Sequence, residues 1–393
     1  MAPEVVWSEL PTMPAGLRVL DPMAGSGTTL VTARLRGHRA IGFDSDPLAV
    51  LLSSTWTANI HPGVLRGKAQ DVLRRAKALV VSGKLKGRDA FPAHADTETR
   101  NFLRYWFDLR NRRQLTALSQ TIRRIQEEPI RNLLWCAFSR MIITKNSGVS
   151  LAMDVSHSRP HRKFSKAPVV PFAQFLRSVE YVIKASPFSD ANHEAPDATI
   201  RNADARCLPV RANSIDIVIT SPPYLNAIDY IRGHKLSLVW MGHSISALRA
   251  LRSTNIGTET GRYSESHEAT NKIVRRMCDI TLMSNRRVAM LRQYVCDMRS
   301  MIGEIHRVLR PNGKAVLVIG DCNIGNTFVE NSRCLRMVGK QAGLEPKRTR
   351  RRLLPENRRY LPPPTSIRAG IDLQRRMREE VILTFRKPAL RTQ

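Results

Sequence analysis

A turn that combines a hydroxyl, a carbonyl and an aromatic ring follows a short apolar run in the second half of the chain. The run 217–220 is β-branched, which favours a buried parallel strand. Ser221, Pro222, Pro223 and Tyr224 come directly after it. Neither proline has an N–H to continue a ladder, and Pro223 forces Pro222 into an extended conformation. The turn therefore lies at the carboxyl end of a strand, where open α/β sheets bind ligands.

The groups of this turn suit a nucleophile of one kind, the exocyclic amine of a nucleobase. Such an amine is weak because its lone pair is delocalised into the ring. Two acceptors, the Ser221 hydroxyl and the Pro222 carbonyl, would engage its two N–H bonds and free the lone pair for in-line attack on a methyl group. Tyr224 would stack on the base, a contact worth roughly 1–3 kcal/mol. The structural alternative is a simple proline-rich turn, because about one Pro-Pro pair is expected in a chain of this size.

The Ser-Pro-Pro-Tyr turn resembles the catalytic motif of amino-methyltransferases that act on cytosine N4 or adenine N6 in DNA. Its spelling is similar to the cytosine-N4 branch, since adenine enzymes usually carry Asp or Asn at the position of Ser221. The resemblance implies that the target base is extruded from the duplex, because the amine is out of reach inside it. The catalytic residues that it implies are Ser221, Pro222, Pro223 and Tyr224.

A second candidate site lies near the N-terminus, in a β-α-β pattern over residues 17–44. Gly25 and Gly27 follow the first strand and would let the backbone approach a ligand closely. Asp44 ends the second strand, and an acid at that distance can accept both ribose hydroxyls. Only one Gly-x-Gly pair is present, which argues against a pyrophosphate cradle. Asp21 would repel a phosphate and would suit a cationic amine or sulfonium. A tight β-α connection is the structural alternative.

The run 21–29 resembles the S-adenosylmethionine motif of the same methyltransferases, usually written Asp-Pro-Phe-x-Gly-Ser-Gly-Thr, with Met23 in place of the common Phe. The resemblance implies that this run lines the cofactor and that Asp44 contacts its ribose. It also implies that Asp204, after the third strand, contacts the adenine, for which a solvated turn aspartate is the alternative. The implied cofactor-binding residues are Asp21, Pro22, Ala24, Gly25, Ser26, Gly27, Thr28, Thr29, Asp44 and Asp204.

The elements that must position these sites form one sheet with an insertion. Predicted strands interleave with helices and begin near residues 17, 39, 199, 216, 314, 347 and 381. This pattern predicts an α/β fold with a doubly wound seven-stranded sheet. The resemblance implies a Rossmann-like methyltransferase sheet whose last two strands form an antiparallel hairpin.

About 150 residues separate the second and third strands, far more than a β-α connection needs, and their apolar spacing predicts helices. We therefore expect three segments. They are residues 1–50 as the cofactor-binding first half of the methyltransferase domain, 51–197 as a largely helical insertion for target recognition, and 198–393 as the catalytic second half.

Three further segments carry weaker expectations. Prolines at 3, 11 and 14 break the stretch before the first strand, so the covering helix that such enzymes usually have there is not expected. The basic loop 157–166 suits contacts with phosphates, with a solvated loop as the alternative. Residues 243–280 are polar and irregular, which fits a DNA-facing segment or a flap.

Composition indicates the partner. The chain has 63 Lys and Arg against 33 Asp and Glu, a net charge of +30, which predicts a polyanionic partner. Its 6 cysteines show no Cys-x-x-Cys spacing, so neither a metal site nor a disulfide framework is expected. No signal pattern and no apolar run long enough to span a membrane is present, so we expect a cytoplasmic protein without a membrane partner.

Together these features predict a methyltransferase that transfers a methyl group from S-adenosylmethionine to cytosine N4 in double-stranded DNA. A cognate restriction endonuclease that acts separately is a further partner that the resemblance allows. Adenine-N6 methylation, RNA methylation and a non-catalytic nucleic-acid-binding role remain open alternatives.

Overall fold

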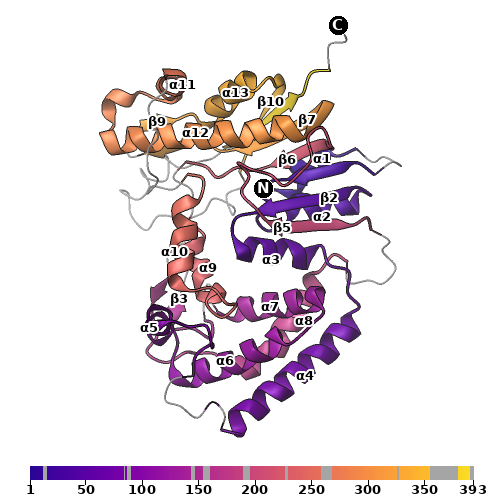
Figure 1. Cartoon of the computed structure of the whole chain (residues 1–393), viewed down its shortest axis with the longest axis vertical. Coiled ribbons are helices and arrows are strands. Elements are labelled where there is room, and N and C mark those ends of the chain that lie inside the picture. Colours follow the sequence, from indigo (N-terminus) through magenta and orange to yellow (C-terminus); the bar gives the residue numbers. More distant parts are fainter. Residues whose placement is uncertain are drawn as a thin grey trace. The chain divides into compact units, whose positions relative to one another are not determined.

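The computed structural model describes residues 1–11, 16–83, 85, 90–142, 147–153, 160–188, 195–225, 229–257, 268–324, 327–354 and 379–389 (Figure 1). The chain divides into two compact units. The sheet unit comprises Met1–Ser45, Ala195–Ala227 and Ser253–Gln393. The helical unit comprises Asp46–Glu194 and Ile228–Arg252.

A seven-stranded sheet forms the centre of the sheet unit. Its order is β10-β11-β7-β6-β1-β2-β5. The five strands from β7 to β5 are parallel, and β11 runs antiparallel to both β7 and β10. The predicted doubly wound sheet and its terminal antiparallel hairpin are confirmed. The strands are β1 Arg18–Asp21, β2 Arg39–Asp44, β5 Ala198–Asn202, β6 Ile215–Thr220, β7 Leu309–Ile319, β10 Glu345–Leu353 and β11 Glu379–Arg386.

Helices cover both faces of this sheet. Along β6, Val218 packs into one hydrophobic cluster, and Ile217 and Ile219 pack into another, because successive side chains of a strand point to opposite faces. A strand buried on both faces needs an apolar run, and β6 has one over residues 217–219. The elements that accompany the sheet are α1 Pro3–Glu9, α2 Thr28–Leu35, α11 Glu268–Met277, the 3-10 turn η1 Ile280–Leu282, α12 Asn285–Val308, the hairpin β8 Cys322–Ile324 and β9 Thr327–Val329, and α13 Asn331–Gln341.

The helix α1 was not expected from the sequence. Pro3 stands at its first helical position, where a missing N–H leaves no helical hydrogen bond unmade. Val5 and Val6 are buried, and Glu9 pairs with Lys314 at 2.5 Å. Apolar burial and this ion pair therefore support a short helix ahead of β1, despite the prolines nearby.

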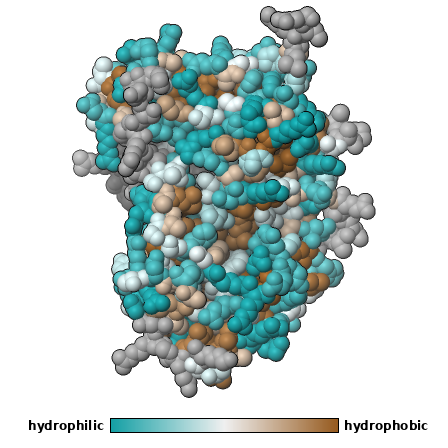
Figure 2. Space-filling view, in the orientation of Figure 1, coloured by the Kyte–Doolittle hydropathy of each residue, from teal (hydrophilic) through white to brown (hydrophobic). Residues whose placement is uncertain are grey.

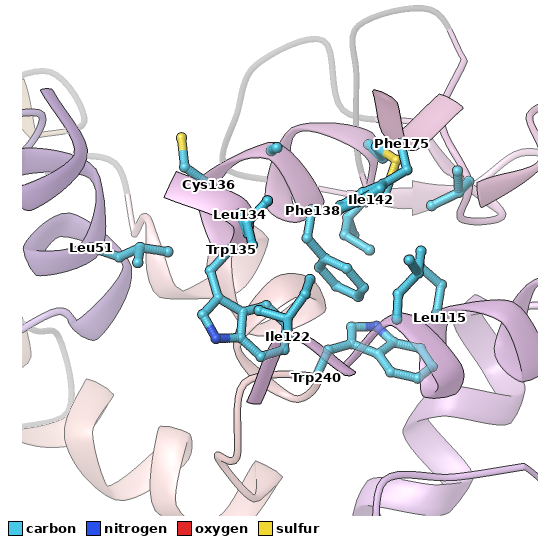
Figure 3. Packing of buried hydrophobic residues seen from close by; sticks show 14 of the residues in the cluster. Leu51, Leu115, Ile122, Leu134, Trp135, Cys136, Phe138, Ile142, Phe175 and Trp240 are labelled. Atoms are coloured by element: carbon cyan, nitrogen blue, oxygen red, sulfur yellow. The ribbon is translucent and has the colours of Figure 1, made fainter. Parts of the chain in front are cut away.

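Helices make up most of the helical unit. Phe138 and Trp240 lie at its centre, with ring centroids 6.3 Å apart, and Phe107 meets Trp240 edge-on at 5.1 Å. Figure 3 shows Leu115 and Ile122 near the rings of Phe138 and Trp240. The predicted helical insertion is thus present. Its elements are α3 Pro47–Trp56, α4 Pro62–Val81, α5 Thr97–Trp106, α6 Leu109–Arg123, α7 Glu128–Ile142, β3 Ala152–Met153, β4 His161–Arg162, α8 Pro171–Ala185, α9 Ile231–Leu238 and most of α10 Ile245–Thr254.

Two segments differ from the sequence-based expectation. Residues 228–252 belong to the helical unit and not to the second half of the sheet domain, because Leu236 and Trp240 are buried in the helical core. The segment 243–280 contains α10 and α11 where irregular structure was expected, and its residues 258–267 lie outside the described part. The predicted role of the insertion in target recognition stays a prediction.

The described part of the chain was also searched for membrane spans and metal sites. It contains no helix that is long and apolar enough to cross a membrane. It also contains no group of three or more His, Cys, Asp or Glu side chains that could hold a metal ion. On the face shown in Figure 2, hydrophilic residues surround smaller hydrophobic areas.

Candidate active site at the carboxyl edge of the sheet

The two turns predicted from the sequence meet at the carboxyl ends of β1 and β6. These strands are parallel neighbours, so Asp21 and Thr220, the last residues of each, lie side by side. The Thr220 hydroxyl donates a hydrogen bond to Asp21 Oδ1 at 2.6 Å. Ser221 is the next residue after Thr220. One buried hydrogen bond therefore connects the candidate cofactor turn to the candidate catalytic turn.

Asp21 is an acid in a nearly closed environment, with a relative exposure of 2%. Burial raises its pKa, and hydrogen bonds from the Thr220 hydroxyl and from the Met23 N–H offset part of that rise. A nearby cation would favour the ionised form of this carboxyl group, and a phosphate would oppose it. The site is therefore suited to a ligand with a positive group.

The glycine turn brings Asp44 to the same edge. Gly25 and Gly27 have φ angles of +53° and +83°, which residues other than glycine rarely adopt. A Cβ atom at Gly25 would meet nothing within 4 Å, so a ligand can approach the backbone there. The Gly25 N–H donates to Asp44 Oδ2 at 2.9 Å. An acid at the end of β2 thus lies directly beside the open turn.

The other residues of the first motif differ in exposure. Pro22 and Ala24 are buried, Thr28 begins α2, and Ser26 is exposed. Thr29 is fully buried and donates to the Ile219 carbonyl at 3.3 Å. The buried members therefore position the turn, and their assignment as direct cofactor contacts stays a prediction.

Asp204 follows β5 and forms a forked ion pair with Arg206, with Nη2 2.7 Å from Oδ2. Burial alone would raise the pKa of Asp204, but the hydrogen bonds from Arg206 outweigh it and hold that pKa below its usual value. Arg206 also reaches Asp297 of α12 at 2.7 Å. Asp204 is thus an ionised and well-oriented acid, and its predicted contact with adenine stays a prediction.

In the second turn, both oxygens predicted to accept hydrogen bonds are available as acceptors. The Ser221 hydroxyl donates its proton to the Val318 carbonyl of β7 at 3.0 Å, which leaves its lone pairs for an incoming donor. The Pro222 carbonyl receives no hydrogen bond from the described residues. Strand β7 thereby fixes the orientation of the hydroxyl, and the role of both oxygens as acceptors for an amine stays a prediction.

Side chains that the sequence did not single out hold the rest of this turn. The Tyr224 hydroxyl donates to Glu380 Oε1 at 3.2 Å, and Arg352 lies 3.5 Å from the other oxygen of this buried carboxylate. The Tyr294 hydroxyl donates to the Pro223 carbonyl at 3.2 Å, and burial raises the pKa of Tyr294 well above its usual value. Two glutamates directly before the apolar run of β11 were the one signal that could have marked Glu380.

Other residues near the turn in sequence find partners within the helical unit. His234 Nδ1 lies 2.5 Å from Asp46 Oδ2, and Asp229 pairs with Arg252 and, at 3.1 Å, with Arg232. These contacts give all of them local structural roles.

The basic loop 157–166 is described only from residue 160 onward. Residues 161–162 form β4, and the Arg162 guanidinium lies over the Tyr105 ring at 5.2 Å. Arg159, one of its four cations, lies outside the described residues. The contact of this loop with phosphates stays a prediction.

Comparison with known proteins places the chain beside methyltransferases. No family model matches it. It is 21% identical over 384 residues to the type II methyltransferase M.BsoBI of Geobacillus stearothermophilus, an alignment that covers 84% of this chain and 74% of that protein. It is 22% identical over 333 residues to the type II methyltransferase M.MvaI of Kocuria varians, with 77% and 70% covered.

Among solved structures, the chain is similar to a SAM-dependent methyltransferase from Methanosarcina mazei. Identity is 9%, the TM-score is 0.34, and 98% of this chain and 97% of that chain are covered. At this TM-score the fold assignment depends on the strand order of the sheet itself.

Proposed function

We propose that the protein is a DNA methyltransferase that transfers a methyl group from S-adenosylmethionine to the N4 amine of cytosine. The observation that carries this proposal is the hydrogen bond from Thr220 to Asp21. It joins the candidate cofactor turn to the candidate catalytic turn at one edge of the sheet. Similarity to two type II methyltransferases over most of the chain supports the same reaction class. The net charge of +30 supports a nucleic-acid substrate.

The residues of the first turn fit a nucleoside with a cationic group. Asp44 accepts the ribose hydroxyls, and its position beside the open backbone at Gly25 supports this role. Asp21 supplies negative charge in a buried setting, and Asp204 supplies an ionised acid after β5. S-adenosylmethionine, when bound, supplies the methyl group.

The residues of the second turn prepare the base. Ser221 Oγ and the Pro222 carbonyl accept the two N–H bonds of the exocyclic amine, so its nitrogen becomes pyramidal and its lone pair becomes available. The Tyr224 ring stacks on the base, and Glu380 fixes the orientation of that ring. No strong base is required, because the nitrogen becomes acidic once it carries the methyl group and then releases a proton to water.

The serine at position 221 favours cytosine N4 over adenine N6 as the target. The net charge of +30 would also suit an RNA substrate. A non-catalytic binding protein is disfavoured because both acceptor oxygens are present and the Ser221 hydroxyl keeps its lone pairs for an incoming donor.

The test is to incubate the purified full chain with S-adenosylmethionine and unmethylated DNA, and to identify the modified nucleoside by mass spectrometry after complete digestion. N4-methylcytosine is the expected product. N6-methyladenine would replace the proposed target. Methylation of RNA alone, or no methylation despite cofactor binding, would overturn the DNA assignment.

A further inference from the structure

An open pocket of about 660 Å³ lies in the sheet unit, outside both turns of the candidate active site. The end of α11, the turn η1, the strand β9 and the start of α13 form its walls. Arg275, Arg276 and Arg333 contribute guanidinium groups, and Phe328 contributes an aromatic ring. None of these residues has a part in the methyl-transfer chemistry proposed above.

Backbone contacts hold the walls of this pocket in place. The Glu330 N–H donates to the Met277 carbonyl at 3.0 Å. Arg333 Nη1 donates to the Arg276 carbonyl at 3.0 Å, and its Nη2 pairs with Glu330 at 3.0 Å. Glu330 and Arg333 therefore join α13 to α11 and fix these two walls of the pocket to each other.

The charge available to a ligand comes mainly from the end of α11. Arg276 is exposed and forms no ion pair with any described residue. Arg275 is 3.9 Å from Glu268 in a solvent-exposed pair, and such pairs are weak. The pocket acid Asp279 is held by the Thr281 hydroxyl at 2.6 Å. Further exposed cations on α11, α12 and α13 include Lys272, Arg286, Arg287 and Arg336.

Cations at the last turn of a helix also offset the helix dipole, so charge alone would not identify a ligand. Phe328 is the second and independent observation. Its side chain is 55% exposed on the short strand β9, paired with Asn323 of β8. An exposed aromatic ring beside Arg276, unpaired among the described residues, and the weakly paired Arg275 matches a nucleotide, whose base stacks on the ring and whose phosphate binds Arg.

The pocket is structurally connected to the catalytic turn. The hairpin β8–β9 that carries Phe328 begins at Cys322, whose thiol donates to the Leu225 carbonyl at 3.3 Å. Leu225 is the residue after Tyr224. Asn331 Nδ2, at the start of α13, donates to the Gly320 carbonyl at 2.9 Å, just past β7. These two bonds link the catalytic turn and the end of β7 to the hairpin and the helix that form the pocket.

We propose that the pocket binds a nucleotide of the DNA strand that flanks the target base, with the base on Phe328 and its phosphate on Arg275 and Arg276. The proposal rests on the proposed function. Extrusion of a target base disrupts the local stack, and a stacking platform stabilises the exposed neighbour whatever its sequence.

The test measures binding of a fluorescein-labelled single-stranded oligothymidine of about twelve nucleotides to the full chain, a length within the range that one binding groove covers. Phe328→Ala should weaken binding by about five- to a hundredfold, because stacking of one base is lost. Arg275→Ala with Arg276→Ala should lower the slope of log affinity against log salt by up to about 1.4.

Two matched controls should bind like the parent. Leu353→Ala removes an exposed apolar side chain from β10, and Arg211→Ala removes an exposed cation from the turn before β6. A second measurement uses tryptophan fluorescence. DNA should quench the emission of the indole that Phe328→Trp adds. The emission of the indole that Leu353→Trp adds should not change when DNA is added.

The inference is overturned if the pocket variants bind DNA as tightly as the control variants and DNA does not quench the indole at position 328. The proposed function would then still stand on cofactor binding and on the modified nucleoside. If the parent chain binds no DNA and methylates none, the proposed function fails, and the nucleotide pocket fails with it.

Discussion

The sheet unit and the helical unit bury different kinds of side chain. At the carboxyl edge of the sheet, the acids Asp21 and Glu380 are buried and accept hydrogen bonds from the hydroxyl groups of Thr220 and Tyr224. At the centre of the helical unit, Phe107, Phe138 and Trp240 pack against one another. Geometry at the sheet edge thus depends on directional hydrogen bonds, and the helical core depends on apolar area.

This difference separates function from stability. A buried polar group must find its partner, and the pair adds little net stability because both groups leave water. Buried aromatic rings contribute in proportion to the area they remove from water. Substitutions at the sheet edge should therefore change chemistry or binding more than stability, and substitutions in the helical core should do the reverse.

The largest effect is expected in the helical core. Phe138→Ala should lower the free energy of unfolding by about 3–5 kcal/mol, because a fully buried ring is replaced by a cavity. Urea denaturation measures the loss. Val81→Ala, at a side chain that is 84% exposed at the end of α4, should stay within about 0.5 kcal/mol of the parent. A similar loss in both variants would contradict the contrast between core and surface.

Ser221→Ala should lower turnover by about one to two orders of magnitude, since it removes one transition-state acceptor worth about 1.5–3 kcal/mol. Cofactor affinity should not change. Single-turnover methylation assays measure the effect. Ser300→Ala, which removes an exposed hydroxyl on α12, is the control and should keep parental turnover. Unchanged turnover in Ser221→Ala would refute the role of this hydroxyl.

Asp44→Ala should weaken S-adenosylmethionine binding by about tenfold, or about 1.4 kcal/mol, and leave DNA binding unchanged. Calorimetry on the purified variant measures it. Asp216→Ala is a matched control, because Asp216 lies near the opposite end of β6, where it accepts from the Arg18 N–H at 2.8 Å and pairs with Arg310 at 2.5 Å. If both variants bind the cofactor equally well, the ribose is not held by Asp44.

The smallest effect concerns pH. Because the pKa of Asp204 is lowered in the folded state, this acid contributes stability above its ordinary pKa of 3.8 and loses it as the pH falls through the lowered value. Asp204→Asn should reduce stability at pH 7 by about 0.2–1 kcal/mol, the range of partly exposed pairs.

The difference between Asp204→Asn and its parent should shrink below pH 3.8. Thermal unfolding of both proteins, measured from pH 7 to below pH 3.8, tests this expected change. Glu4→Gln, at an exposed acid of α1, is the control. A difference that stays constant with pH would show that the ion pair with Arg206 is not its source.

Much of the local structure could be predicted from the sequence. The apolar run before Ser221, the small-residue turn after β1 and the 3–4 spacing of Leu115, Leu118 and Ile122 each report the conformation of their own neighbourhood. Strands, turns and helices arise from such short-range preferences. The seven strands of the sheet and the helical insertion therefore followed from pattern alone.

The tertiary structure alone decided which residues meet. The bond between Thr220 and Asp21 joins positions 199 residues apart, and Glu380 reaches Tyr224 across 156 residues. Residues 228–252 return to the helical core for the same reason, because burial of Trp240 depends on helices far away in sequence. No local pattern encodes these pairs, since each exists only once the strand order and the helix packing have made the two residues neighbours.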